Sequence, residues 1–348
     1  LAELIREMES YYNFPKREEI VLYPIFDGKI QYSFQFILGS PIDKHDLHEL
    51  ASLVSAYFWC WRETLLDQEY EAAESVTVFD ASADVRKRAA ALDIGTVCDD
   101  IAAAVKNADL VLLCVPVGAM EAVMKAAAPH LKSGAILSDV GSVKTSVFET
   151  VSHHVPEHVH FIPGHPIAGT EKSGPEAGFA SLFRDRWCIL TPPVGADEVA
   201  LATLSDFWTV IGSTVEVMTP ERHDRVLAIT SHLPHLIAFN IVATAADMEQ
   251  VTEGEVVKYS AGGFRDFTRI AASDPTMWRD VFLNNKDAVL ETLGRFTEDL
   301  AALQRAIRWA DGDALFDLFT RARGIRQSII EAGQDTAAPD FGRSTDED

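Results

Sequence analysis

The feature that most constrains the fold is a regular alternation of short apolar runs and helical stretches from Val76 to about Pro193. The expected strands are Val76–Phe79, Leu110–Val115, Ala135–Asp139 and His160–Ile162, and the expected helices between them are Ser82–Leu92, Ala119–Leu131 and Val143–Val151. Strands that alternate with helices at this spacing are typical of βαβ units and a parallel sheet. We therefore predict a Rossmann-type α/β domain over residues 75–193.

From Asp197 to about Gly333 the strand pattern ends and long helical patterns follow. The expected helices are Asp197–Ile211, Pro220–Asp247, Val251–Ser260, Thr276–Asn284, Asp287–Trp309 and Ala314–Ala332. Thr219 is a good N-cap with Pro220 at the first helical position, and Pro234 should kink the helix that contains it. The sequence predicts an all-helical domain over residues 194–333, followed by an acidic tail over residues 334–348.

The composition excludes some classes of partner. The chain carries 30 basic and 53 acidic residues, a formal net charge of −23, whereas nucleic acids and anionic membranes reward clustered lysine and arginine. No run approaches the ~20 apolar residues of a membrane span. Cys60, Cys98, Cys114 and Cys188 show no paired spacing, which favours free thiols in a reducing compartment. With no visible signal peptide, we expect a cytoplasmic protein.

Three strand ends carry residues that suit a bound dinucleotide. Asp80 ends the first expected strand, where an acid accepts hydrogen bonds from ribose hydroxyls and favours NAD over NADP. The alternative is that Asp80 only caps the next helix. Val115 and Pro116 lie at the second strand end, and Gly141 with Ser142 at the third, where small and turn-forming residues let a nucleotide pass close to the backbone.

The glycine-rich loop of such a domain is missing from its expected place. It should lie roughly 20–25 residues before the acid, but that interval falls in the aromatic stretch Ala56–Trp61, which has no glycine. Residues 1–74 do hold plausible strands at Glu19–Tyr23 and Ile30–Leu38, and a plausible helix at Asp46–Leu66. We therefore treat residues 1–74 as an atypical segment that replaces the first βα unit.

His165 is the strongest candidate for a catalytic base. It lies in the glycine- and proline-rich run Gly164–Glu171 after an expected strand, on what should be a rigid turn at the carboxyl edge of the sheet. Ser142 follows a neighbouring strand and offers an orienting hydroxyl. The alternative is a histidine that merely packs in a loop.

Five long motifs decide between these alternatives, namely SDVGSVK, GHPIAGTEKSGP, RWCILTPP, HDRVLAITSHLPH and GFRDFTRIAASDPTMWRD. Together, and in this order, they resemble the prephenate and arogenate dehydrogenase family from about Val76 to about Gly333. The resemblance implies a Rossmann domain joined to a helical domain through which two subunits form a homodimer. It also implies NAD-dependent oxidative decarboxylation of prephenate or arogenate, to 4-hydroxyphenylpyruvate or tyrosine, in tyrosine biosynthesis.

The resemblance also implies roles for individual residues. His165 accepts the hydrogen bond of the ring hydroxyl as hydride leaves for the nicotinamide, and Ser142 hydrogen-bonds both His165 and that hydroxyl. Arg269 binds a substrate carboxylate, which suits its bidentate guanidinium. His235 lines the pocket and Glu171 controls its access and charge.

Other polar and aromatic residues keep two interpretations. Asp266 is expected to brace the arginine region, and His223 with Asp224 either caps a helix or joins the pocket. His232 is expected to pack, and Trp278 and Trp309 to lie in the core or the dimer interface. The histidines of one short segment could suggest a metal, but no cysteine completes a ligand set and we predict none; they are His153, His154, His158 and His160.

Two alternatives to a working enzyme remain. A hydroxyacid dehydrogenase of similar plan would lack the GHPIAGTE and GFRDFTR motifs together. A catalytically impaired homologue or binding module would follow if residues 1–74 leave no phosphate loop, either as a genuine replacement or as a foreign peptide from a shifted reading frame or wrong gene start. The sequence does not decide between prephenate and arogenate, or whether tyrosine inhibits.

Overall fold

A computed structural model describes residues 33–38, 72–93, 95–169, 178–179, 181–249 and 262–331. The chain divides into two compact units, residues 1–31 and 32–348. Every described residue belongs to the second unit.

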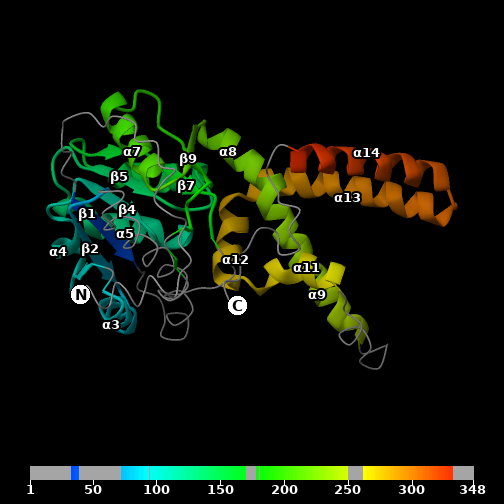
Figure 1. Cartoon of the computed structure of the whole chain (residues 1–348), viewed down its shortest axis with the longest axis horizontal. Helices are drawn as coiled ribbons and strands as arrows, with labels where there is room; N and C mark the ends of the chain where they lie inside the picture. The colour runs from blue at the N-terminus through cyan, green and yellow to red at the C-terminus, as the bar shows by residue number, and fades with distance from the viewer. Residues whose placement is uncertain are drawn as a thin grey trace, which may run out of the picture. The chain divides into compact units, whose positions relative to one another are not determined.

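The predicted parallel sheet is confirmed. Its strands follow the order β3-β2-β1-β4-β5-β6 and all neighbours pair in parallel (Figure 1). The strands are β1 (Ser33–Leu38), β2 (Ser75–Asp80), β3 (Thr96–Val97), β4 (Leu110–Leu113), β5 (Ile136–Asp139) and β6 (His160–Phe161). The strand order reverses between β1 and β4, which is the switch point where doubly wound sheets bind ligands.

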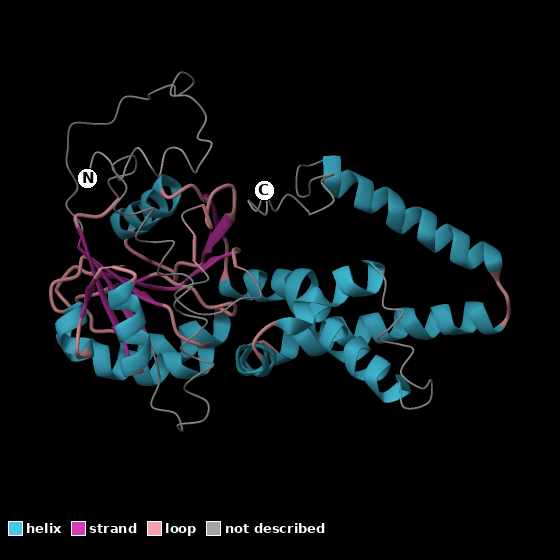
Figure 2. Cartoon of the chain, turned by 60° about the horizontal axis from the view of Figure 1, so that its bottom comes forward, coloured by secondary structure: helices cyan, strands magenta, loops and turns pink. Residues whose placement is uncertain are grey.

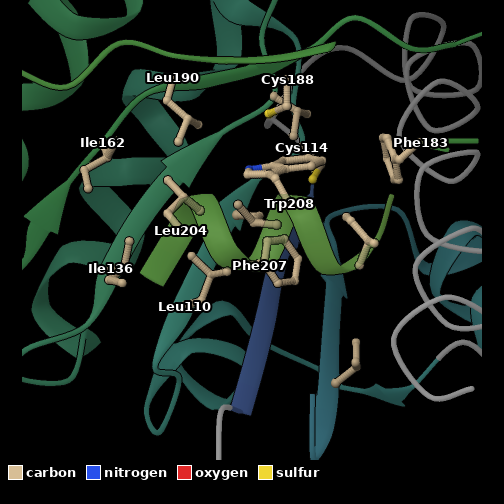
Figure 3. Close-up of a cluster of buried hydrophobic side chains, with 14 of the residues drawn as sticks. Leu110, Cys114, Ile136, Ile162, Phe183, Cys188, Leu190, Leu204, Phe207 and Trp208 are labelled. Carbon is tan, nitrogen blue, oxygen red and sulfur yellow. The ribbon is translucent and has the colours of Figure 1, made fainter. Parts of the chain in front are cut away.

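Helices cover both faces of this sheet, because successive strand residues point to opposite sides. One face packs Leu110, Leu112 and Ile136 beneath α7 (Glu198–Val210). Figure 3 shows Leu204 and Phe207 of that helix beside Leu110. The opposite face, with Val111, Leu113 and Leu137, packs against three helices, α4 (Ile101–Val105), α5 (Met120–Ala127) and α6 (Thr145–Val151). β4 is apolar at every position because both of its faces are buried.

The first strand of the sheet is present, which corrects the expectation that residues 1–74 replace it. Phe36 of β1 registers with Val78 on one side and Leu112 on the other, so β1 fills a central position. The plausible strand Ile30–Leu38 is thus observed as Ser33–Leu38. Counting back from Asp80 failed because it assumed a short connection between β1 and β2. Glu19–Tyr23, the stretch Asp46–Leu66 and the segment after Leu38 lie outside the described residues.

A second, three-stranded sheet was not predicted. It consists of β7 (Gly164–Pro166), β8 (Trp187–Leu190) and β9 (Thr214–Val217), with β7 antiparallel to β8 and β8 parallel to β9. The expectation that strands end before Asp197 was wrong, since β9 lies beyond it. Strands of three or four residues are too short for their alternation to stand out in a sequence.

The individual helices predicted after Asp197 agree with the observed ones within a few residues, but α7, which was predicted in the helical domain, packs on the parallel sheet. The helical domain lies beyond it. It comprises α8 (Pro220–Leu227), α9 (Leu233–Glu249), α11 (Gly262–Thr268), α12 (Pro275–Asn284), α13 (Lys286–Arg308) and α14 (Gly312–Glu331). In Figure 2 the strands lie together in one part of the described chain, and these helices form the other part. Thr219 caps α8 by accepting a hydrogen bond from the Arg222 amide, as expected. The expected helix Val251–Ser260 lies outside the described residues.

The expected kink at Pro234 takes the form of a π-helical turn. Ala228–His232 is π-helix between α8 and α9, and the Leu233 amide donates to the Ala228 carbonyl five residues back. Pro234 has no amide hydrogen to donate, so the regular ladder is already broken at this point. Such π turns are frequent at functional sites, and this one carries the buried His232.

Candidate active site

A buried ion pair at the carboxyl end of β5 organises the site. The Lys144 ammonium is fully buried and donates to Asp139 and, at 2.6 Å, to the Gly164 carbonyl oxygen. Asp139 also accepts from the Gly141 amide at 2.8 Å and from the Gly164 amide at 3.3 Å. These contacts hold β7 against the end of β5. The side chain of His165, the next residue along β7, is thereby fixed in position.

His165 lies on β7 rather than on the turn that we expected. It pairs with Ile189 of β8 and is 8% exposed. Burial, followed by the charges of His223, Lys144 and His232, holds the pKa of His165 well below 6.5. The imidazole is therefore neutral at physiological pH, as a base must be.

His223 and Asp224 continue from His165 in a hydrogen-bonded chain. Nδ1 of His165 lies 2.8 Å from Nε2 of His223, and Nδ1 of His223 lies 2.8 Å from an Asp224 carboxylate oxygen. Asp224 also accepts from the backbone amides of Lys144 and Thr145, at 2.8 and 2.9 Å. These contacts join His223 and Asp224 to His165, and Asp224 also caps the start of α6 (Thr145–Val151).

Ser142 does not make the expected hydrogen bond to His165 among the described residues. It is half-buried directly after Gly141, but the Nδ1 atom of His165 is already bonded to His223. This competition could not be predicted from the sequence, because His223 lies 58 positions away from His165. The adjacent residues His223 and Asp224 near a helix start were the available signal that this region takes part in the site.

A second polar group surrounds Trp278. His235 stacks on the Trp278 ring with centroids 3.6 Å apart, and its Nδ1 lies 2.9 Å from the Ser231 carbonyl oxygen. Because that carbonyl only accepts, Nδ1 of His235 carries the proton and Nε2 keeps its lone pair. Burial lowers the pKa of His235, and the positive charge of Arg269 adds to this effect while the Ser231 hydrogen bond opposes it.

His232 is buried, as expected, but it lies among polar groups. Nδ2 of Asn285 contacts both the Asp224 carbonyl oxygen at 2.9 Å and Nδ1 of His232 at 3.0 Å. Burial lowers the pKa of His232 to about 4, with the charge of His223 acting in the same direction. Trp278 is likewise buried, at 6% exposed, whereas Trp309 is exposed.

Two other predicted residues have different outcomes. Asp266 was expected to brace the arginine region, but it pairs with its neighbour Arg265 at 3.4 Å and both side chains are exposed. Among the described residues, the Asp266 carboxylate thus pairs with the adjacent residue of the same exposed helix and not with a residue of the arginine region. Glu171 lies outside the described residues.

Asp80 fits the ribose of a dinucleotide better than it fits a helix cap. Ser82, not Asp80, caps α3 (Ala83–Ala91) by accepting from the Val85 amide. One Asp80 carboxylate oxygen accepts from the Ser82 amide at 2.6 Å, and the other is buried with no partner among the described residues. A buried oxygen without a donor is costly, and a ribose hydroxyl would satisfy it. Burial raises the pKa of Asp80 to about 6 despite that hydrogen bond and the nearby Arg86.

The other predicted cofactor residues also lie where the sheet presents its carboxyl ends. Val115 is buried just beyond β4, and Pro116 starts the 3₁₀ turn Val117–Ala119. Gly141 follows β5, and a Cβ there would lie 2.7 Å from the Met120 methyl group. A side chain there would require the flexible end of Met120 to move and would crowd the Asp139 carboxylate at 3.0 Å, so the packing favours glycine at this position.

The histidine-rich segment binds other protein groups. Nε2 of His154 lies 3.2 Å from Glu121, and Nε2 of His158 lies 3.3 Å from the Leu131 carbonyl oxygen. Within the described part of the chain, no group of three or more His, Cys, Asp or Glu residues could hold a metal.

The depressed histidine pKa values predict that acid weakens the fold. His165, His223 and His232 all have pKa values below 6.5, so the unfolded chain binds more protons once pH falls below that value. For His232 the loss develops between pH 6.5 and about 4 and reaches about 3 kcal/mol. Asp80, with its raised pKa, contributes with the opposite sign there.

The measurement therefore compares variants. Unfolding free energies from urea titrations at several pH values should fall less steeply with acid in His232→Leu than in the parent chain. His153→Gln, a change at an exposed position, serves as the control and should leave the slope unchanged. Equal slopes for the parent chain and His232→Leu would contradict the assignment.

Comparisons with known proteins agree with this geometry. Residues 66–217 match the family model for the nucleotide-binding domain of prephenate dehydrogenase, and residues 219–321 match the model for its dimerization domain. A cyclohexadienyl dehydrogenase from Zymomonas mobilis is 46% identical over 256 residues, which cover 73% of this chain and 87% of that protein. A prephenate dehydrogenase from Bacillus subtilis is 32% identical over 244 residues, 69% of this chain and 66% of that protein.

A solved structure shares the whole two-domain arrangement. It is the prephenate dehydrogenase from Aquifex aeolicus in complex with hydroxyphenyl propionate and NAD⁺, with a TM-score of 0.74 and 31% identity, covering 87% of this chain and 99% of that one. The family models together span both described domains and begin at residue 66, after β1. The chain belongs to the prephenate dehydrogenase family.

Proposed function

We propose that this chain catalyses the NAD-dependent oxidative decarboxylation of prephenate or arogenate, giving 4-hydroxyphenylpyruvate or tyrosine for tyrosine biosynthesis. The observation that carries the proposal is His165, a buried and neutral imidazole fixed by the Lys144–Asp139 pair. The relatives with the same domains are a cyclohexadienyl and a prephenate dehydrogenase, which supports this substrate class.

The chemistry needs a base and correct orientation of the substrate. NAD, when bound, accepts the hydride from the ring carbon that carries the hydroxyl. Loss of hydride leaves positive character on that carbon, and transfer of the hydroxyl proton to His165 relieves it. Loss of carbon dioxide is then driven by formation of the aromatic ring, so the protein mainly has to hold the substrate in place.

Arg269 supplies the local positive charge that an anionic substrate needs. The chain as a whole has a net charge of −23, so long-range attraction does not favour such a substrate. Arg269 begins the 3₁₀ turn Arg269–Ala272 and lowers the pKa of His235 by its charge. We assign a substrate carboxylate to Arg269, the pocket wall to His235, and the ring hydroxyl to Ser142 together with His165. Glu171 and Asp266 remain candidates for pocket access and support.

The cofactor preference is assigned to Asp80. Its unpartnered buried oxygen would accept a ribose hydroxyl and repel a 2′-phosphate. Backbone turns at Val115, Pro116 and Gly141 would lie beside the rest of the nucleotide.

We also propose that the chain forms a homodimer through its helical domain and works in the cytoplasm. Large apolar side chains are exposed along α13 and α14, namely Leu290, Leu300, Ile307, Phe316, Phe319, Ile325, Ile329 and Ile330. So many on two neighbouring helices mark an interface. The matched family model is that of a dimerization domain. Cys98, Cys114 and Cys188 are free thiols, which suits a reducing compartment.

One helical stretch also passes a membrane-span test by length and composition. Pro220–Met248 is long and apolar enough to cross a membrane. Its first half, however, carries Asp224, His223 and His232, which are buried and hydrogen-bonded to protein groups. We therefore assign this stretch to the core of the helical domain and its interface.

Activity is tested by following the NADH absorbance band after NAD is added with prephenate, and in parallel with arogenate. We expect turnover with at least one substrate, and their relative kcat/KM gives the preference. His165→Asn should lower kcat by on the order of 10²–10⁴-fold, because the base is lost while binding contacts remain. His154→Asn is the matched surface control and should match the parent. No NADH with either substrate, in a chain that binds NAD, would contradict the proposal.

Cofactor binding is tested by calorimetric titration with NAD and with NADP. We expect measurable NAD affinity, and Asp80→Asn should weaken it roughly 10-fold or more, because a hydrogen bond to a charged group is lost. The same change should reduce the ratio of the affinity for NAD to the affinity for NADP. Asp84→Asn, exposed in the first turn of α3, is the control. Absence of NAD binding to the parent chain would favour the impaired homologue.

Assembly is tested by analytical ultracentrifugation. The parent chain should sediment as a dimer, and Phe316→Glu should shift it toward the monomer, since it places a charge in the apolar contact. Val194→Glu, at a fully exposed position of the first domain, should leave the dimer intact. A monomeric parent chain at micromolar concentration would rule out this interface.

A further inference from the structure

The direction of the hydrogen bonds in the chain from His165 to Asp224 is set at its carboxylate end. Asp224 accepts from the amides of Lys144 and Thr145 and from His223. Burial by itself would raise the pKa of Asp224, but the hydrogen bonds from His223, Lys144 and Thr145 hold it below its ordinary value. An ionised carboxylate has no proton to give, so Nδ1 of His223 must carry the proton of that bond.

The proton position on His223 then dictates the proton position on His165. The pKa of His223 is lowered, by burial above all, so its ring is neutral and its Nε2 has a lone pair. That lone pair faces Nδ1 of His165 at 2.8 Å, so Nδ1 of His165 donates and keeps its proton. The remaining nitrogen of His165, Nε2, is left with the lone pair that a base requires.

The opposite arrangement is disfavoured by the same contacts. If Nε2 of His223 carried the proton, its bare Nδ1 would face the Asp224 carboxylate at 2.8 Å, with two lone pairs in contact inside the protein. Asp224 cannot rotate away, because both its oxygens are held by amides at the start of α6. The side-chain amide of Asn285 also donates to the backbone carbonyl oxygen of Asp224.

We propose that His223, anchored by Asp224, is a positioning residue that holds His165 in the tautomer with a free Nε2. This inference rests on the proposed function, since it concerns the base of that reaction. The base comes from β7 and its support from α8, so the tautomer depends on the contact between the first domain and the helical domain. When His165 takes up the substrate proton, His223 remains its hydrogen-bond acceptor and shares the resulting positive charge with Asp224.

Two substitutions separate positioning from mere packing. His223→Leu fills similar space and offers no acceptor, whereas His223→Gln offers an oxygen toward His165 and an N–H toward Asp224. For prephenate with NAD, we expect His223→Leu to lower kcat ~100-fold with KM changed less than about threefold, as expected for loss of base orientation. His223→Gln should recover most of that loss, to within about tenfold of the parent. Unchanged kcat in His223→Leu, or no recovery in a folded His223→Gln, would overturn the proposal.

A second measurement does not depend on activity. In the ¹⁵N-histidine spectrum of the full chain, His165, assigned by its loss in His165→Asn, should show a protonated Nδ1 and a bare Nε2. This pattern should persist in His223→Gln and in His232→Leu, a control that removes another buried histidine. It should become mixed in His223→Leu. A protonated Nε2 in the parent chain would overturn the proposal even if the enzyme is active, and the expected pattern would support it even if prephenate is not a substrate.

Discussion

The site depends on one buried ion pair. Lys144 binds Asp139 and the Gly164 carbonyl oxygen through its ammonium, and its backbone amide donates to Asp224. The residue therefore joins the end of β5, the strand that carries His165 and the helix that carries His223. Removing one partner of such a pair leaves an uncompensated buried charge, at a cost of about 3–5 kcal/mol. It would also release the base from its place.

The same charge shapes the chemistry of the histidines around it. Burial lowers the pKa of His165 most, and the positive charge of Lys144 adds to this effect. The imidazole is thereby kept neutral, and among the described residues no carboxylate hydrogen-bonds His165 directly. Asp224 acts one residue further away, through His223. Acid sensitivity of the fold is the physical consequence, because each buried neutral histidine favours the unfolded state once it can be protonated.

The sequence predicted the parts of this molecule that have strong periodicity or long motifs. Strands β2, β4, β5 and β6 and the long helices followed from such patterns, and the long motifs singled out His165 as a candidate. The short strands β7, β8 and β9 did not, because three or four residues carry little alternation. The bond between His165 and His223 could not be predicted either, because it joins residues 58 positions apart whose neighbours each allowed a local explanation. The strand β1 was predicted, but its place in the sheet was not, because 36 residues of sequence separate Leu38 from Ser75.

The two halves of the site are built from separate parts of the chain, and this determines how each can fail. The adenosine end depends on Asp80 at the tip of β2, next to β1, and its buried oxygen lacks a donor among the described residues. The substrate end depends on β5, β7, α8 and the turn at Arg269, none of which involves residues 1–74. A change confined to Asp80 would therefore weaken binding of the cofactor and leave the tautomer of His165 unchanged. Conversely, a change at His223 would alter the base and leave Asp80 intact, because the two residues belong to different elements with no shared hydrogen bond.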